Sequence, residues 1–139
     1  MHRENRGHRV GIVGAGGISR LHLDGIARHQ DEARVVALCD PDAARLADRA
    51  AEYDISARYA DLSTMVEETA LDAVIVCTPT HIRTEVLLPL IEAGIPTLCE
   101  KPFTESYAEA AAIEARAREL AVPLAINQNF RRHFTFHIA

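Results

Sequence analysis

The sequence has few cysteines and no long apolar run, and its polar first residues lead us to expect no secretion signal. Cys39, Cys77 and Cys99 are far apart and odd in number, which argues against a disulfide framework or a zinc site. Each one ends a short apolar run, so we expect small buried side chains in a reducing cytoplasm. No run approaches the roughly 20 apolar residues that span a bilayer. Residues 1–6 are polar and lack the apolar part of a signal peptide.

The chain also lacks the basic excess that is typical of nucleic-acid-binding surfaces. It has 20 acidic and 15 basic residues, for a net charge of −5. Its 139 residues, 48% hydrophobic and 25% charged, are typical of one soluble globular domain. We therefore expect neither a nucleic-acid nor a membrane partner.

Short apolar runs alternate with helical segments along nearly the whole chain. Strands are expected at residues 9–13, 34–39, 57–59, 73–77, 97–99 and 123–126, and helices at 17–29, 42–53, 62–68, 80–93 and 106–120. The first helix is expected to turn Ile18, Leu21, Leu23 and Ile26 inward. Repeated strand–helix units predict a doubly wound α/β fold with a parallel sheet, in a single domain.

A glycine-rich turn follows the first expected strand and opens the first helix. Gly14, Gly16, Gly17, Ile18 and Ser19 give the pattern G-x-G-x-x-S, close to the dinucleotide-binding fingerprint. The first glycine permits a tight turn, and the second lets the backbone approach a pyrophosphate at the helix N-terminus. The alternative is a turn with a structural role alone.

Asp40 ends the second expected strand. A carboxylate there can accept both hydroxyls of an adenosine ribose and would repel a 2′-phosphate, so NAD is preferred to NADP. Arg45, the nearest arginine, is a helical turn away. Alternatively, Asp40 and Pro41 are the N-cap and first residue of a helix.

The fourth expected strand ends at Cys77, where we expect Cys77, Thr78 and Pro79 to line the cofactor site. Thr80 has the alternative role of a helix N-cap. His81 can touch the cofactor, or it is an ordinary surface residue of the first helical turn.

Glu100, Lys101 and Pro102 follow the fifth expected strand, where open α/β sheets form their ligand crevice. Lys101 is the candidate catalytic residue, since a lysine beside a nicotinamide can hold a substrate hydroxyl and help move its proton. Glu100 pairs with this lysine or contacts cofactor hydroxyls. The alternative is an inert surface lysine.

Amides and guanidinium groups follow the last expected strand, in residues 127–132. Such groups suit a polyol or a carboxylate, so we expect Asn129 beside the cofactor and Arg131 beside the substrate. The alternative is a polar connector.

Together these motifs resemble the N-terminal half of the glucose–fructose oxidoreductase / inositol dehydrogenase / rhizopine-catabolism (Gfo/Idh/MocA) family. The resemblance implies an NAD(P)-dependent dehydrogenase that acts on sugars, inositols or related hydroxy compounds. It also implies a catalytic role for Lys101 and a ribose-binding role for Asp40. The family often has a histidine where this chain has Arg83, and the sequence leaves open whether His81 replaces it.

The family also has a second α/β domain, which supplies an aspartate and a histidine beside the substrate and supports oligomers. We expect a flexible tail at residues 1–7, a dinucleotide-binding Rossmann domain at 8–127, and at 128–139 the start of a junction to that second domain. Homo-oligomers are expected only for the full-length protein, and the isolated chain is expected to bind NAD with little turnover.

Two other functions remain open from the sequence. A non-catalytic NAD-binding redox sensor or docking module would need the glycine turn but not Lys101. A Rossmann methyltransferase would also use an acidic residue at the end of the second strand, but the Lys-Pro sequence after the fifth strand fits that class poorly.

Overall fold

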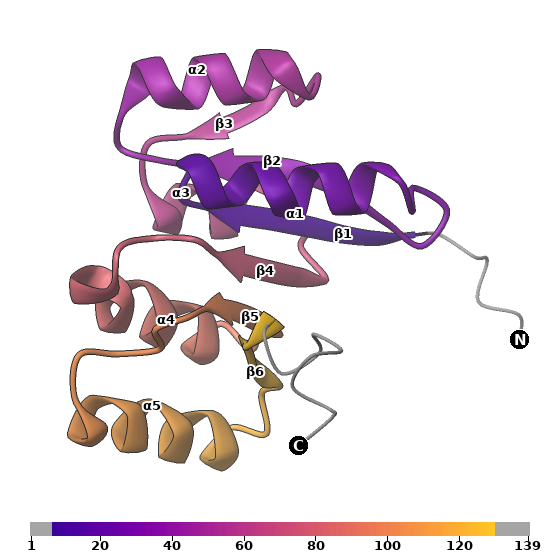
Figure 1. The fold of residues 1–139 in the computed structure, drawn as a ribbon. Helices are drawn as coiled ribbons and strands as arrows, with labels where there is room; N and C mark the ends of the chain where they lie inside the picture. The colour runs from indigo at the N-terminus through magenta and orange to yellow at the C-terminus, as the bar shows by residue number, and fades with distance from the viewer. Residues whose placement is uncertain (1–6, 130–139) are drawn as a thin grey trace, which may run out of the picture.

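The computed structural model describes residues 7–129. Over these residues six strands form one parallel sheet in the order β3-β2-β1-β4-β5-β6 (Figure 1). The strands are β1 (His8–Val13), β2 (Ala33–Cys39), β3 (Ala57–Tyr59), β4 (Ala73–Val76), β5 (Thr97–Glu100) and β6 (Leu124–Asn127). The predicted doubly wound α/β fold is confirmed.

Helices cover both faces of this sheet (Figure 1). They are α1 (Gly17–Ala27), α2 (Ala43–Glu52), α3 (Leu62–Glu68), the short 3₁₀ helix η1 (Thr80–Ile82), α4 (Arg83–Glu92) and α5 (Tyr107–Glu119). Helices α1 and α2 pack on one face, and α3, α4 and α5 pack on the other. None of the helices in residues 7–129 combines the length and the apolar character that crossing a membrane requires.

Strand β4 shows why the sheet needs helices on both sides. Val74 and Val76 belong to the core cluster under α3, α4 and α5, whereas Ile75 belongs to the cluster under α1 and α2. Successive side chains of a strand point to opposite faces, so a strand without polar residues must be covered twice. Burying one such side chain contributes roughly 1.5–3 kcal/mol.

The order of the strands determines where the sheet forms a ligand crevice. The sheet grows outward from β1 in one direction through β2 and in the other through β4. The loops after β1 and β4 therefore lead to opposite faces and leave a crevice at the carboxyl ends of the strands.

Helix α1 differs from the expectation in phase and length. Leu23 is 2% exposed, but Leu21 is 65% exposed and Ile18 36% exposed, so the prediction that these two point inward is wrong. The buried stripe runs through Ser19, Leu23 and the half-buried Ile26, which puts Leu21 on the opposite side. The helix also ends at Ala27, before the expected residue 29.

Two expected helix starts are also corrected. The Asp42 side chain, not that of Asp40, caps α2, because it accepts a 3.0 Å hydrogen bond from the Arg45 N–H. Thr80 caps no helix: it is the first residue of η1, and α4 begins only at Arg83. In α5 the expected capping box is present, with Ser106 accepting from the Glu109 N–H.

Candidate active site

A crevice at the carboxyl ends of β1, β2, β4 and β5 contains most of the residues predicted from the sequence. Its lining comprises Gly14, Gly16, Gly17, Ile18, Asp40, Arg45, Cys77, Thr78, Pro79, Arg83, Glu100 and Lys101. Ten of these are predicted site residues, brought together from four separate loops.

The glycine turn has one position that the fold requires and two that stay open. Gly14 has a φ of +95°, and a Cβ there would lie 2.9 Å from the Cys77 carbonyl carbon. A Cβ on Gly16 or Gly17 would meet no atom within 4 Å. This open space lies at the N-terminus of α1, where helices bind phosphate.

Asp40 lines the crevice on the side of the glycine turn and is 4% exposed. Its carboxylate accepts hydrogen bonds of 2.8 Å from the N–H groups of Ala15 and Asp42. One oxygen also lies 3.6 Å from Nη1 of Arg45, whose other Nη is 3.2 Å from Asp42. Asp40 therefore ties the glycine turn to the start of α2.

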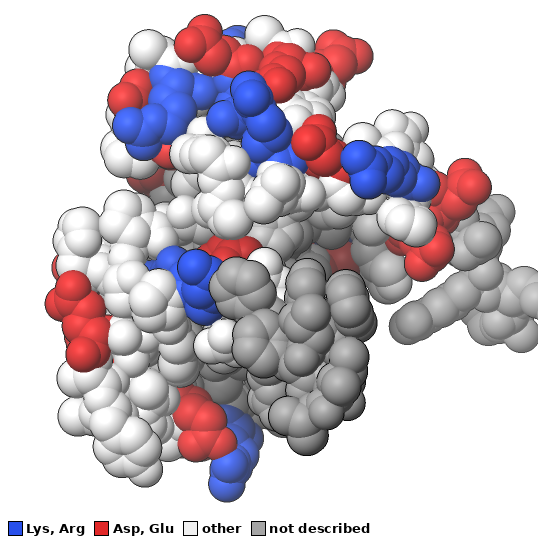
Figure 2. Space-filling model, viewed as in Figure 1, with Lys and Arg blue, Asp and Glu red and all other residues white. Residues whose placement is uncertain are grey.

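Arg49 supports the glycine turn from α2. Its guanidinium donates to the carbonyls of Ala15 and Gly16 at 3.4 Å and to Glu52 at 2.6 Å. Arg20 donates to the same glutamate at 3.0 Å. The cationic side chains on the α1–α2 part of the visible face lie among acidic ones, so this part is not a continuous basic patch (Figure 2).

Cys77 and Thr78, at the end of β4, line the same crevice as the glycine turn and Lys101. The Thr78 hydroxyl is buried and is the one such side-chain oxygen in residues 7–129 without a hydrogen-bond partner. Burial and, to a lesser extent, the charge of Glu100 raise the pKa of the Cys77 thiol to about 12. Cys77 is therefore a neutral wall residue and not a nucleophile.

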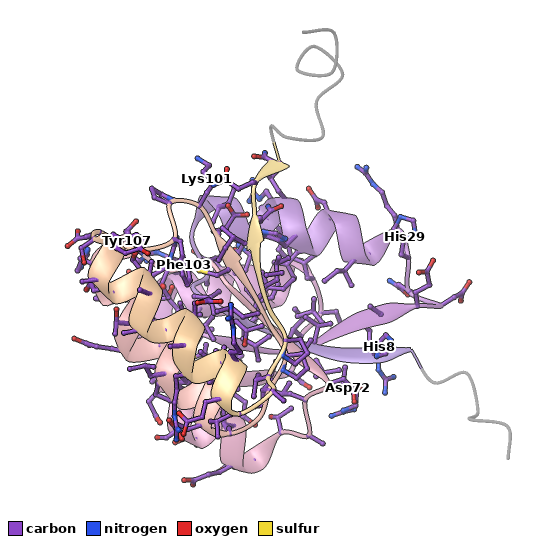
Figure 3. All side chains as sticks on the ribbon, turned by 90° about the horizontal axis from the view of Figure 1, so that it is seen from below. His8, His29, Asp72, Lys101, Phe103 and Tyr107 are labelled. Carbon is purple, nitrogen blue, oxygen red and sulfur yellow. The ribbon has the colours of Figure 1, made fainter. Side chains whose placement is uncertain are left out.

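Lys101 combines a fixed backbone with a free side chain. Its side chain projects from the end of the sheet (Figure 3), and its ammonium has no hydrogen-bond or ion-pair partner within the described part of the chain. Arg83, 3% exposed, donates to the carbonyls of Glu100 and Pro102, on either side of this lysine. It also donates to the Thr78 carbonyl at 2.8 and 3.2 Å.

Glu100 is buried, and its carboxylate is surrounded by hydrogen-bond donors. Its Oε1 is 2.7 Å from His22 Nε2 and accepts from Asn127 Nδ2 at 2.6 Å, and its Oε2 accepts from the Lys101 N–H at 3.2 Å. Burial alone would raise the pKa of Glu100, but hydrogen bonds from Asn127 and His22, with the charge of His22, leave this pKa below its ordinary value. Glu100 is thus an anion at neutral pH, although it does not pair with the Lys101 side chain.

Three predicted residues are not part of this crevice as described. His81 is exposed in η1, and Asn129 is exposed beyond β6; neither lines the crevice. Arg131 lies outside the described residues.

Sequence reasoning missed three residues of the site. His22 and Asn127 hold Glu100, and Arg83 holds the loop on both sides of Lys101. One signal was available: Arg83 follows the Thr-Pro turn closely, on the helix that enters beside the crevice. His22 and Asn127 carry no such signal, because their partner is 78 and 27 residues away in sequence.

Comparison with known proteins decides the family. The model of the GFO_IDH_MocA oxidoreductase family, with its NAD-binding Rossmann fold, matches residues 8–128. This chain belongs to that family. Membership decides against the methyltransferase class and agrees with the resemblance seen in the sequence.

Its relatives are dehydrogenases of greater length. The chain is 35% identical to inositol 2-dehydrogenase of Corynebacterium glutamicum and 39% identical to that of Leifsonia xyli, over 91% of this chain and 37% of each relative. Among solved structures, the WlbA dehydrogenase of Bordetella pertussis in complex with NADH and UDP-GlcNAcA superposes with a TM-score of 0.91, at 28% identity. That match covers 96% of this chain and 40% of the other. The chain thus spans little more than a third of the length of these relatives.

Proposed function

We propose that this chain is the NAD-binding part of a cytoplasmic dehydrogenase that oxidises a hydroxyl of a sugar, an inositol or a related compound. The observation that carries the proposal is the crevice itself, at the point where the sheet reverses its strand order. There a lysine ammonium without a partner among residues 7–129 lies beyond an open glycine turn. The substrate class is supported by the relatives that are named inositol 2-dehydrogenases.

The residues present fit a nicotinamide dinucleotide. Gly16 and Gly17 leave space at the start of α1 for the pyrophosphate, and Asp40 offers carboxylate oxygens to the adenosine ribose. The buried Thr78 hydroxyl lacks a partner within the chain as described, and a polar group in the crevice would supply one. Ile18, Cys77 and Pro79 provide the remaining wall.

Lys101 has the catalytic role in this proposal. Bound NAD supplies the hydride acceptor, so the protein must hold the substrate hydroxyl and accept or relay its proton. The Lys101 ammonium can donate a hydrogen bond to that hydroxyl, because no described residue competes for it. An ammonium has no acceptor, so the hydroxyl proton would pass to a base of the second domain, such as the histidine that the family resemblance implies. Glu100 remains a structural anion below the lysine. Contacts from His81 and Asn129 to the cofactor and from Arg131 to the substrate stay predictions.

The domain organisation is part of the proposal. We propose that residues 8–127 form the cofactor-binding unit and that residues 128–139 begin the connection to the substrate domain that the family resemblance implies. Oligomers would form through that second domain.

Calorimetric titration with NAD and NADP tests the proposal. We expect NAD to bind more tightly, and Asp40→Ala to weaken NAD binding at least about tenfold, because it removes the ribose acceptor and loosens the glycine turn. Lys101→Ala should change NAD affinity less than about threefold if this lysine mainly serves the substrate. Glu105→Ala, an exposed change beyond the crevice, is the control. Absence of NAD binding by the folded chain would overturn the proposal.

A further inference from the structure

Helix α1 contributes two separate groups to the crevice. Its first turn borders the space beside Gly16 and Gly17, and His22, just over one turn later, reaches Glu100 on β5. The His22 side chain is 14% exposed and that of Glu100 5% exposed, so water is largely excluded from this contact. Because an ionised carboxylate only accepts, His22 Nε2 is the donor.

Asn127 completes the arrangement from the neighbouring strand β6. It donates to the same Oε1 that His22 contacts, which leaves Oε2 for the N–H of Lys101. Two donors on one oxygen fix the rotation of the carboxylate. The position of Oε2 therefore depends on both residues.

The backbone of Lys101 is then fixed from both sides. Its N–H donates to Glu100 Oε2. Arg83 restricts the movement of the loop, because its guanidinium donates to the carbonyls before and after the lysine. A side chain with several rotatable bonds reaches a defined place only if its Cα is held. Preorganisation of this kind determines how well a catalytic group meets its substrate.

We propose that His22 is a positioning residue for Lys101: through Glu100 it sets the backbone from which the lysine reaches the substrate. This inference rests on the proposed function, since it assigns a purpose to the lysine that the dehydrogenase would use. His22 itself touches neither substrate nor cofactor in this role.

The sequence provides an unusually direct test, because Lys101 is its one lysine. Protein labelled only with ¹⁵N-lysine gives a single backbone amide signal, and that amide is the donor to Glu100 Oε2. We expect His22→Ala to shift this signal and to increase its hydrogen-exchange rate about tenfold, because the carboxylate loses one of its two fixing donors. Asn127→Ala should act in the same direction.

Two matched variants separate positioning from general loss of structure. His22→Gln retains a side-chain N–H donor, so its signal and exchange rate should return to within about twofold of the wild type. His29→Ala changes an exposed histidine just beyond α1 and should have no effect. Thermal unfolding of each variant shows whether the fold is intact. An unchanged Lys101 signal in folded His22→Ala would overturn the inference, as would failure of His22→Gln to restore it.

The Lys101 amide signal can be measured without NAD, so it is a separate readout from the calorimetric titration. If the wild type binds no NAD by calorimetry, the proposed function fails, and so does the purpose assigned to the contact, whatever the amide signal shows. If NAD binds normally and the Lys101 signal ignores His22, only the positioning inference fails.

Discussion

The two loops that border the crevice are held by similar contacts but offer different groups to a ligand. Arg49 donates to the carbonyls of Ala15 and Gly16 in the glycine turn, and Arg83 donates to the carbonyls on both sides of Lys101. The Arg49 side chain is 12% exposed and also pairs with Glu52, whereas Arg83 is 3% exposed and contacts backbone oxygens.

The difference follows from what each loop presents. The glycine turn offers backbone N–H groups and empty space, so any side chain there would obstruct a ligand. The lysine loop offers a single ammonium on a long side chain, so its backbone must be fixed by other residues. One loop therefore depends on the absence of side chains, and the other on buried side chains that never reach the ligand.

The largest expected effect comes from Gly14→Ala. The positive φ and the 2.9 Å approach of a new Cβ to the backbone of Cys77 leave no way to relax except by moving β4 away from β1. We expect a loss of about 3 kcal/mol or more in the free energy of unfolding, measured by urea denaturation.

Gly16→Ala is the matched control in the same turn. A Cβ there meets nothing within 4 Å, so stability should change by less than about 1 kcal/mol while NAD affinity falls. Equal destabilisation by the two changes would contradict the distinction between a structural and a ligand-facing glycine.

The next largest effect tests the two arginines. Arg83→Met removes the donor to carbonyls of Thr78, Glu100 and Pro102, and buried carbonyls without a partner are costly. We expect the unfolding free energy to fall by about 2–4 kcal/mol, against less than about 1 kcal/mol for Arg49→Met, whose bonds are longer and closer to solvent. Thermal denaturation of both variants measures the difference. Similar losses would show that burial of Arg83 is not what fixes the lysine loop.

Local patterns predicted the architecture because each signal lies within a few residues. The uninterrupted apolar segment Ala73–Val76 indicated a strand covered on both faces. The Gly14 turn indicated where the first strand, β1, leads into the first helix. The Asp40 carboxylate was placed at the crevice for the same reason. Its alternative role as a cap failed because Asp42, two residues later, has the same chemistry.

What the sequence could not predict depends on contacts between distant segments. Nothing near His22 reveals that Glu100 will lie beside it. The Thr-Pro turn before Arg83 indicates its place beside the crevice, but not that its guanidinium will bind the carbonyls of Glu100 and Pro102. Leu21 shows a further limit, because α1 has apolar residues on more than one side and the sheet selects which side is buried.

The smallest expected effect is the pH dependence produced by Glu100. The pKa of Glu100 in the folded protein is lowered, so its carboxylate stabilises the fold when the pH is above the ordinary pKa of a glutamate. This contribution is lost as the pH falls through the pKa that Glu100 has in the folded protein. Glu100→Gln lacks the charge and replaces an acceptor oxygen with a donor, so it should be destabilised by about 1–2 kcal/mol at pH 7. The difference in unfolding free energy between Glu100→Gln and the wild type should become smaller in acid, because the protonated wild-type carboxyl also loses an acceptor.

Urea denaturation between pH 7 and pH 3 measures this gap, with Glu105→Gln as the control because that side chain is exposed on the loop that follows β5. A gap that stays constant with pH would mean that the charge of Glu100 does not matter and that its shape alone holds the lysine loop. A gap that closes in acid would show that the lysine loop, unlike the glycine turn, is held by a buried charge. Gly14→Ala, which acts through steric overlap, should show no such pH dependence.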